Sequence, residues 1–178
     1  MIRKYVFACL TIVVVSCSSI QNKKPQQYLR YVQGYTHFRS NDPFAIYSLP
    51  NDAFFERMVD LEYEQEAGYM VTIIERAKGF FYVRFDYPDI GTAWMRKGEI
   101  GLNIRGLESY EDRDSVPIRR RPRSRSRIIG TLTKPQHVQI LDVSKSWAYV
   151  EAIGSNGESI RGWLAPIYQC GNPYTTCP

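Results

Sequence analysis

The fold of this chain is decided by Val138-Gln139-Ile140-Leu141-Asp142-Val143-Ser144-Lys145-Ser146-Trp147-Ala148-Tyr149-Val150-Glu151. Apolar and polar residues alternate on both sides of a short polar turn, which is typical of two β-strands that form a hairpin. A second copy stands 67 positions earlier, at residues 71–84, with apolar, acidic, basic and aromatic residues at matching places. The sequence therefore predicts an all-β protein built on an internal repeat.

A second turn follows the quoted stretch. Residues 155–158 contain the pair Asn156-Gly157, which tolerates the positive φ angles of a tight hairpin. This turn predicts that residues 147–153 pair with residues 159–164. Successive side chains of a strand point to opposite faces. We expect the small aliphatic residues of the first strand to face the interior and two of its rings to face outward. The inward set is Ala148, Val150 and Ala152, and the outward rings are Trp147 and Tyr149.

The start of the chain predicts export. A basic start, residues 1–4, precedes an apolar run at residues 5–15, which is shorter than the roughly 20 residues of a membrane-spanning helix. Val14-Val15-Ser16-Cys17 resembles the bacterial lipobox, and this resemblance implies a signal peptide at residues 1–16 and a lipid on Cys17. The alternative is an ordinary signal peptide with a chance cysteine. Lipid would anchor the chain to a membrane without spanning it.

The residues after Cys17 bear on location and reach. In the sorting pattern of enterobacteria, an aspartate after the cysteine retains a lipoprotein at the inner membrane, so Ser18 and Ser19 favour the outer membrane. Residues 17–42 are mostly polar and are predicted to be a tether. Four aromatic residues near its end could place three rings on one helix face, so its later part could pack against the first domain. These aromatic residues are Tyr28, Tyr31, Tyr35 and Phe38.

Four short motifs follow one another in residues 115–169. They are Val116-Pro117-Ile118-Arg119 with Pro122, Ile129-Gly130-Thr131-Leu132, Trp147 with Val150, and Gly162-Trp163-Leu164. Together they resemble the bacterial SH3-like (SH3b) domain. The resemblance implies a small antiparallel β-barrel. The earlier copy is divergent, because it has Tyr47 in place of the arginine and lacks the glycine step.

The repeat and this resemblance together imply two small SH3-like barrels in tandem after the signal and the tether. The predicted boundaries are residues 43–106 for the divergent first domain, 107–114 for an acidic linker, and 115–178 for the second domain.

The two predicted domains carry opposite charge. Residues 43–106 contain 7 basic and 10 acidic residues, and residues 115–178 contain 9 basic and 3 acidic residues. We expect the acidic loop of the first domain, Glu56 to Glu66, to dock on the arginines of the second. Anionic lipid headgroups and the carboxylates of peptidoglycan stem peptides are also possible partners for these arginines. The remaining alternative is that the arginines form a solvated loop without a partner. An exported protein is not expected to bind nucleic acid.

The candidate ligand-binding residues are basic and aromatic. Guanidinium groups bind anions through paired hydrogen bonds, and flat rings accept extended peptides in grooves of SH3-like domains. The alternative for the rings is packing in the core or between the domains. The candidates are Arg119, Arg121, Arg123, Arg125, Trp147, Tyr149, Trp163 and Tyr168. Phe80 and Trp94 are the weaker counterparts in the first domain.

Two cysteines remain at the end of an exported chain in which Cys9 leaves with the signal and Cys17 carries lipid. Cys170 and Cys177 are therefore predicted to form a disulfide. Closing a loop of this length stabilises the folded state by roughly 2 to 3 kcal/mol in the chain-entropy model. Their spacing does not suit a thioredoxin-like redox pair, and no companion ligands suggest a zinc site.

No catalytic motif is found. His37 and His137 are isolated in the sequence, and no nucleophile motif or metal-binding motif accompanies them. We therefore expect a non-catalytic lipoprotein of the bacterial cell envelope, without a cofactor or a metal, that binds peptidoglycan stem peptides. The alternative partner is an envelope protein, for which the chain would be a scaffold, inhibitor or accessory subunit.

Overall fold

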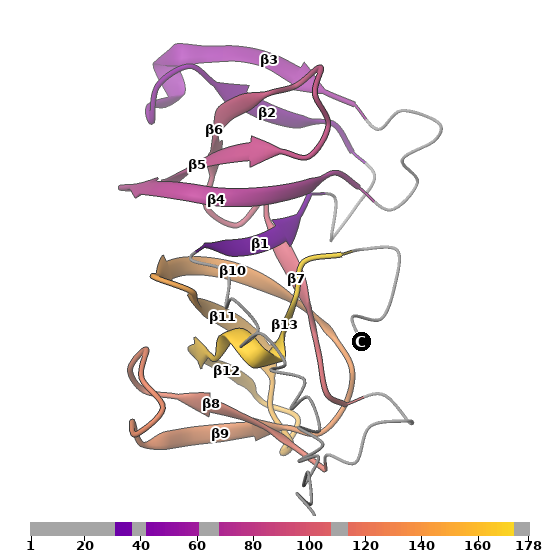
Figure 1. The fold of residues 1–178 in the computed structure, drawn as a ribbon, viewed down its shortest axis with the longest axis vertical. Helices are drawn as coiled ribbons and strands as arrows, with labels where there is room; N and C mark the ends of the chain where they lie inside the picture. Colours follow the sequence, from indigo (N-terminus) through magenta and orange to yellow (C-terminus); the bar gives the residue numbers. More distant parts are fainter. Residues whose placement is uncertain (1–30, 37–41, 61–67, 108–113, 173–178) are drawn as a thin grey trace, which may run out of the picture.

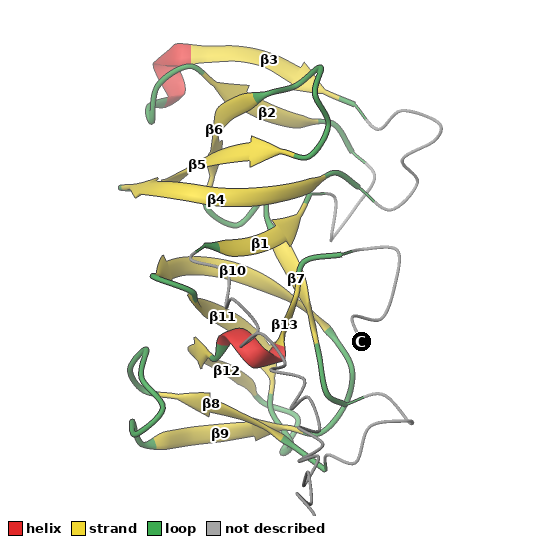
Figure 2. Ribbon diagram, in the orientation of Figure 1, coloured by secondary structure: helices red, strands yellow, loops and turns green. Residues whose placement is uncertain are grey.

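The computed structural model of the chain describes residues 31–36, 42–60, 68–107 and 114–172 (Figure 1). All the strand pairs in these residues are antiparallel and belong to one 13-stranded sheet. The prediction of an all-β protein is confirmed. Two single turns of 3-10 helix are the only helices in the described residues, as Figure 2 shows. No helix in this part of the chain is long and apolar enough to cross a membrane.

The strand bounds fall into two sets. The first set is β1 Val32–Tyr35, β2 Phe44–Tyr47, β3 Phe55–Val59, β4 Met70–Ala77, β5 Phe80–Phe85 and β6 Thr92–Arg96, with the helical turn η1 at Asp52–Phe54. The second set is β7 Gly101–Ile104, β8 Val116–Arg119, β9 Ile128–Leu132, β10 His137–Ser144, β11 Trp147–Ile153 and β12 Ser159–Leu164, followed by η2 at Pro166–Tyr168 and β13 at Gln169–Cys170.

We call β1 to β6 the first unit and β7 to β12 the second unit, because their strands pair in the same order. Read from its outer end, the first unit runs β3-β2-β6-β5-β4-β1, and the second runs β9-β8-β12-β11-β10-β7. The β-bulges also match, since the register shifts between Ile73 and Glu75 and, 67 residues later, between Ile140 and Asp142. The two hairpins predicted at residues 71–84 and 138–151 are both observed.

The units meet through β1 and β7. Tyr35 of β1 pairs with Met70 of β4, and Asn103 of β7 pairs with His137 of β10. His137 lies 67 residues after Met70, and Asn103 lies 68 residues after Tyr35, so the two pairings correspond closely. The two strands also pair with each other at Tyr35 and Gly101. β7 lies in the range predicted as the first domain, yet it pairs with β10 and β13 of the second range.

β1 corrects one expectation about the tether. The prediction of a helix face at its end is wrong for residues 32–35, because Val32 and Tyr35 are buried in a strand that pairs with β4. A strand forms here because β4 leaves an unpaired edge that needs backbone hydrogen bonds. Tyr31 is exposed, and Tyr28 and Phe38 lie outside the described residues.

A single hydrophobic core runs through both units. It draws on the inward faces of β4, β5 and β6 in the first unit and of β10, β11 and β12 in the second. The three residues predicted to point inward from β11 are all buried, which confirms the assigned alternation: Ala148, Val150 and Ala152. β7 contributes three buried residues between the units: Gly101, Leu102 and Ile104.

Candidate binding site

A row of four residues crosses the second unit. Register pairing places Asp142 of β10 opposite Tyr149 of β11, Tyr149 opposite Trp163 of β12, and Trp163 opposite Arg119 of β8. Directly opposed residues of antiparallel strands share a face, and this is the outer face because Ala148 and Val150 point inward. The structure thus brings together three of the predicted ligand-binding residues: Tyr149, Trp163 and Arg119.

The two rings of this row form a partly exposed aromatic pair. The ring centroids of Tyr149 and Trp163 are 5.2 Å apart, with 53° between the ring planes. Trp147 lies two residues before Tyr149 on the same strand and is also partly exposed. Aromatic faces of this kind can accept an extended chain, and the indole and phenol groups add hydrogen-bonding edges.

The first unit repeats the row with different chemistry at its ends. Glu75 stands opposite Tyr82, Tyr82 opposite Trp94, and Trp94 opposite Tyr47. The centroids of Tyr82 and Trp94 are 5.1 Å apart at 41°, close to the geometry in the second unit. Tyr47 is buried where the second unit has Arg119, and Phe80 packs on it at 5.3 Å. The aromatic pair is therefore common to both units, but the arginine belongs to one.

Arg119 is held at the base of a loop. Its Nη1 donates to the carbonyl oxygen of Ser126 at 2.7 Å. Ser126 is buried, and its hydroxyl accepts a hydrogen bond at 2.9 Å from the backbone N–H of Arg121. One guanidinium has five N–H donors, so Arg119 keeps others for a ligand. Ser126 therefore fixes both the arginine and the backbone of the loop, which the sequence did not reveal.

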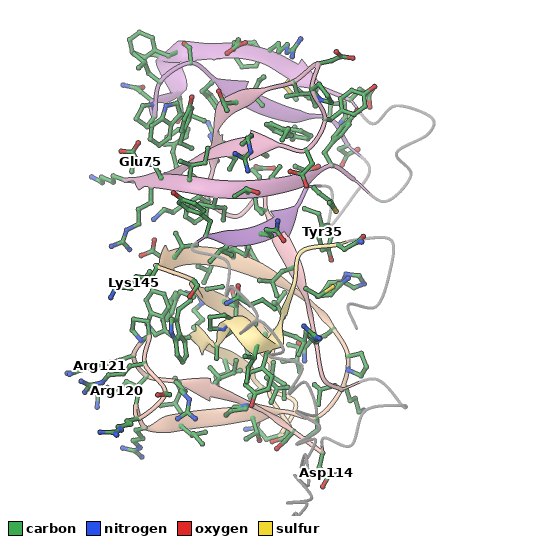
Figure 3. The ribbon with its side chains drawn as sticks, in the orientation of Figure 1. Tyr35, Glu75, Asp114, Arg120, Arg121 and Lys145 are labelled. Atoms are coloured by element: carbon green, nitrogen blue, oxygen red, sulfur yellow. The ribbon has the colours of Figure 1, made fainter. Side chains whose placement is uncertain are left out.

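We call residues 120–127 the arginine loop. Figure 3 shows Arg120 and Arg121 projecting away from the ribbon. The three predicted ligand-binding arginines of the loop are exposed: Arg121, Arg123 and Arg125. None of them makes an ion pair within the described residues.

The expected docking of the acidic loop on these arginines is wrong for its described part. Glu56 lies in β3 and Asp60 directly follows it, whereas the arginine loop joins β8 to β9. β3 and β9 are the two ends of the strand order, and Figure 1 shows them at opposite ends of the molecule. Attraction between oppositely charged segments in a sequence does not bring them together when the strand order separates them. Glu62, Glu64 and Glu66 lie outside the described residues.

A different carboxylate joins the units. Both oxygens of Asp142 are engaged, one by Arg76 Nη1 and the other by Lys97 Nζ, each at 2.9 Å. Burial raises the pKa of this carboxyl. The hydrogen bonds from Lys97 and from the backbone of Val143, with the positive charges of Lys97 and Arg76, outweigh burial and bring the pKa below its ordinary value. In the first unit, the equivalent Glu75 makes no ion pair with a described residue.

A polar cluster lies where β1 meets β7, which Figure 3 marks at Tyr35. The buried Tyr35 hydroxyl donates to Asn103 Oδ1 at 2.7 Å and also contacts His137 Nδ1. The hydroxyl has one proton and can also accept, so it can bond both partners when His137 is in the tautomer with a proton on Nδ1. Burial raises the pKa of Tyr35 further above its already high ordinary value, so the phenol stays neutral at physiological pH. The cluster is suited to joining strands and gives no activated nucleophile.

The other predicted residues fall in different places. Tyr168 lies in η2 and packs against the core, so it is not part of the cross-strand row. Cys170 is disulfide-bonded, and its predicted partner Cys177 lies outside the described residues, as do Cys17 and His37. The described residues hold no group of three or more side chains suited to a metal ion.

Comparison with known proteins gives little. Neither the protein-family models nor the curated proteins contain a match. Among solved structures, the chain is similar to NlpC2 from Trichomonas vaginalis, with 14% identity, a TM-score of 0.32, and coverage of 78% of this chain and 47% of that one. It is also similar to NlpC1 from the same organism, with 15% identity, a TM-score of 0.32, and coverage of 82% of this chain and 47% of that one. The chain thus spans about half the length of these proteins, and such TM-scores do not establish a shared fold.

Proposed function

We propose that this chain is a non-catalytic lipoprotein of the bacterial cell envelope whose two units are SH3-like barrels in tandem. Its second unit binds an extended peptide with carboxylate groups, and the stem peptide of peptidoglycan is the first candidate. The observation that carries this proposal is the row in which Tyr149 and Trp163 stand beside Arg119 on the outer face of the sheet.

The row suits such a ligand in two ways. Trp147, Tyr149 and Trp163 offer partly exposed ring faces to an extended backbone. Arg119 is held by Ser126 with N–H donors to spare, so a carboxylate can bind without the arginine first being ordered. The arginine loop adds a positive field that draws anionic ligands toward the rings.

The cellular location in this proposal rests on the sequence, and the fold rests on the sequence and the strand order. The lipobox-like residues before Cys17 supply the anchor, and Ser18 and Ser19 favour the outer membrane. The matching strand orders of the two units support a tandem of similar domains. We assign the chain to the bacterial SH3-like family on its four motifs, with Cys170 and Cys177 closing the C-terminal loop.

The test is binding to isolated cell wall. The chain from Ser18 onward keeps every described residue and can be incubated with purified sacculi at low and high salt. Trp163→Ala is expected to weaken binding about tenfold or more, as for a central aromatic contact. Trp94→Ala is the matched control in the first unit and is expected to change binding less than threefold. Salt should weaken binding by screening the arginines. Equal binding by wild type and Trp163→Ala, with both folded by circular dichroism, contradicts the proposal.

A second candidate is a scaffold or accessory subunit that binds an envelope protein. It is favoured by β3, an end strand of the sheet on which Phe55 and Met58 are 52% and 51% exposed. An open strand edge with exposed apolar residues can pair with another chain. This candidate predicts a specific co-purifying protein, lost in the double variant Phe55→Ser and Met58→Ser, and no binding to sacculi.

A further inference from the structure

The arginine loop belongs to an unusually basic part of the chain. Residues 115–141 contain six arginines and Lys134, and they contain no aspartate or glutamate. The loop joins β8 to β9 at one end of the molecule, as Figure 1 shows. The cross-strand row reaches this region through Arg119 alone, so most of the positive charge lies beyond the proposed peptide site.

The loop is ordered by its own backbone. Arg120 N–H donates to the carbonyl of Arg127 at 2.9 Å, and Ser126 N–H donates to the carbonyl of Arg123 at 3.0 Å. The N–H of Arg121 also donates to the Ser126 hydroxyl, and together these hydrogen bonds close the loop at both ends. The arginine side chains can therefore meet a partner without a further cost of ordering the backbone.

Apolar residues lie directly beside the charge. Ile128 and Ile129 open β9, and their side chains are 48% and 41% exposed. β9 is an end strand, paired on one side with β8. The surface thus combines two exposed aliphatic side chains at the end of the sheet with guanidinium groups that make no ion pair with a described residue.

We propose that the arginine loop and β9 dock on an anionic lipid bilayer. Arginines on a projecting loop can each meet a different phosphate of a flat, multivalent surface, whereas a single stem peptide offers few carboxylates. Ile128 and Ile129 fit the boundary between headgroups and acyl chains, where apolar side chains at the end of a basic surface are stabilised. A weak lipid-headgroup contact of this kind, added to one lipid anchor, holds a protein more stably than the anchor alone.

The experiment is co-sedimentation with vesicles of phosphatidylcholine alone or with one quarter phosphatidylglycerol, using the chain from Ser18 onward. Binding is expected to the anionic vesicles and to fall as salt is raised. The triple variant Arg121→Gln, Arg123→Gln and Arg125→Gln should lose about 100-fold in affinity, at roughly fivefold for each arginine near the surface. The double variant Ile128→Ser and Ile129→Ser should weaken binding severalfold, and this fold-loss in affinity should be the same at low and high salt.

The matched control removes three exposed charges from the first unit: Arg57→Gln, Lys78→Gln and Arg84→Gln. It is expected to stay within about threefold of wild type, because these side chains lie away from the loop. Equal loss in both triple variants would mean that net charge alone drives binding and would overturn the proposal. Equal binding to neutral and anionic vesicles would overturn it too.

Binding to vesicles and binding to sacculi can be tested separately with two variants. Trp163→Ala should lose sacculi and keep anionic vesicles, because Trp163 is in the row and not in the loop. If the loop variant instead loses sacculi and keeps vesicles, the loop serves the wall peptide and the lipid proposal is wrong. If wild type binds vesicles but not sacculi, the lipid proposal stands and the proposed function fails.

Discussion

At the scale of single residues, Asp142 is the clearest link between the two units. It accepts from Arg76, which lies in β4 of the other unit, and from Lys97, which lies in the turn before β7. A carboxylate that serves two cations in a partly buried place is worth more than an isolated surface pair, whose contribution is about 0 to 1 kcal/mol. The rings of the site were predictable from alternation, but this carboxylate was not, because one aspartate in a strand gives no sign of its partners.

Asp142→Asn should lower the free energy of unfolding by about 1 kcal/mol at pH 7. The folded-state pKa of Asp142 is lowered, so its ionised form stabilises the fold above the ordinary pKa of 3.8, and this stabilisation is lost as the pH falls below that value. The difference between wild type and variant, measured by urea unfolding, should therefore shrink between pH 7 and pH 3.

Asp52→Asn is the control for that prediction. Asp52 pairs with Arg96 at the same distance of 2.9 Å, but both side chains are more than half exposed and belong to one unit. Its effect on the free energy of unfolding should be smaller than that of Asp142→Asn, because water screens an exposed ion pair. If Asp52→Asn lowers the free energy of unfolding as much as Asp142→Asn does, the ion pairs of Asp142 stabilise the protein no more than an exposed pair.

Tyr35→Phe should destabilise the protein by about 1 to 2 kcal/mol. The change removes a buried hydroxyl that serves both Asn103 and His137, and leaves Asn103 Oδ1 without its donor. Tyr82→Phe is the matched control, since its hydroxyl bonds Thr92 at an exposed position and should cost less than about 0.5 kcal/mol. Thermal unfolding of both variants makes the comparison, and equal shifts would contradict the role assigned to the cluster.

At the scale of elements, β1 and β7 are what sequence reasoning could not place. The four hairpin strands can be predicted because apolar and polar residues alternate over six to eight positions, as in Met70–Ala77 and Trp147–Ile153. Val32–Tyr35 and Gly101–Ile104 are four residues long and show no clear alternation. Their pairing depends on edges that exist only after the hairpins have formed, so no local pattern could predict it.

Gly34→Ala should destabilise the contact between β1 and β7 by about 2 kcal/mol, as overpacking does in a tight interior. A Cβ at this position would lie 2.6 Å from the carbonyl oxygen of Gly101 and 2.7 Å from Ile100 Cγ2, so the strands would have to move apart. Gly154→Ala is the control, because its nearest neighbour at 3.1 Å is the flexible side chain of Asn156. Urea unfolding of the two variants tests this, and similar stabilities would refute it.

At the scale of the whole molecule, the units are joined across the predicted linker. β7 precedes residues 107–114, yet it pairs with β10 and β13, which follow them. The sequence suggested two domains held by charge, because opposite net charges are visible in composition and strand exchange is not. The observed junction instead uses the buried residues of β7 and the ion pairs of Asp142.

Cutting the chain within residues 108–113 should leave the two fragments bound together. A protease site inserted there separates β7 from its partners β10 and β13 in the chain but not in the sheet. The fragments should elute as one species in size-exclusion chromatography and separate only in denaturant. Separate elution in native buffer would contradict the strand pairing.

The position of β1 at the start of the first unit has a consequence for biogenesis. Each unit is completed by the strand that comes before its own hairpins, β1 for the first and β7 for the second. A chain that emerges from the ribosome amino end first can therefore finish the leading unit before the trailing one has appeared. Among the pairs within the leading unit, no strand edge must wait for the trailing unit. Only the junction, where β7 pairs with β1, β10 and β13, is completed later, so the surface that could aggregate in the meantime is confined to it.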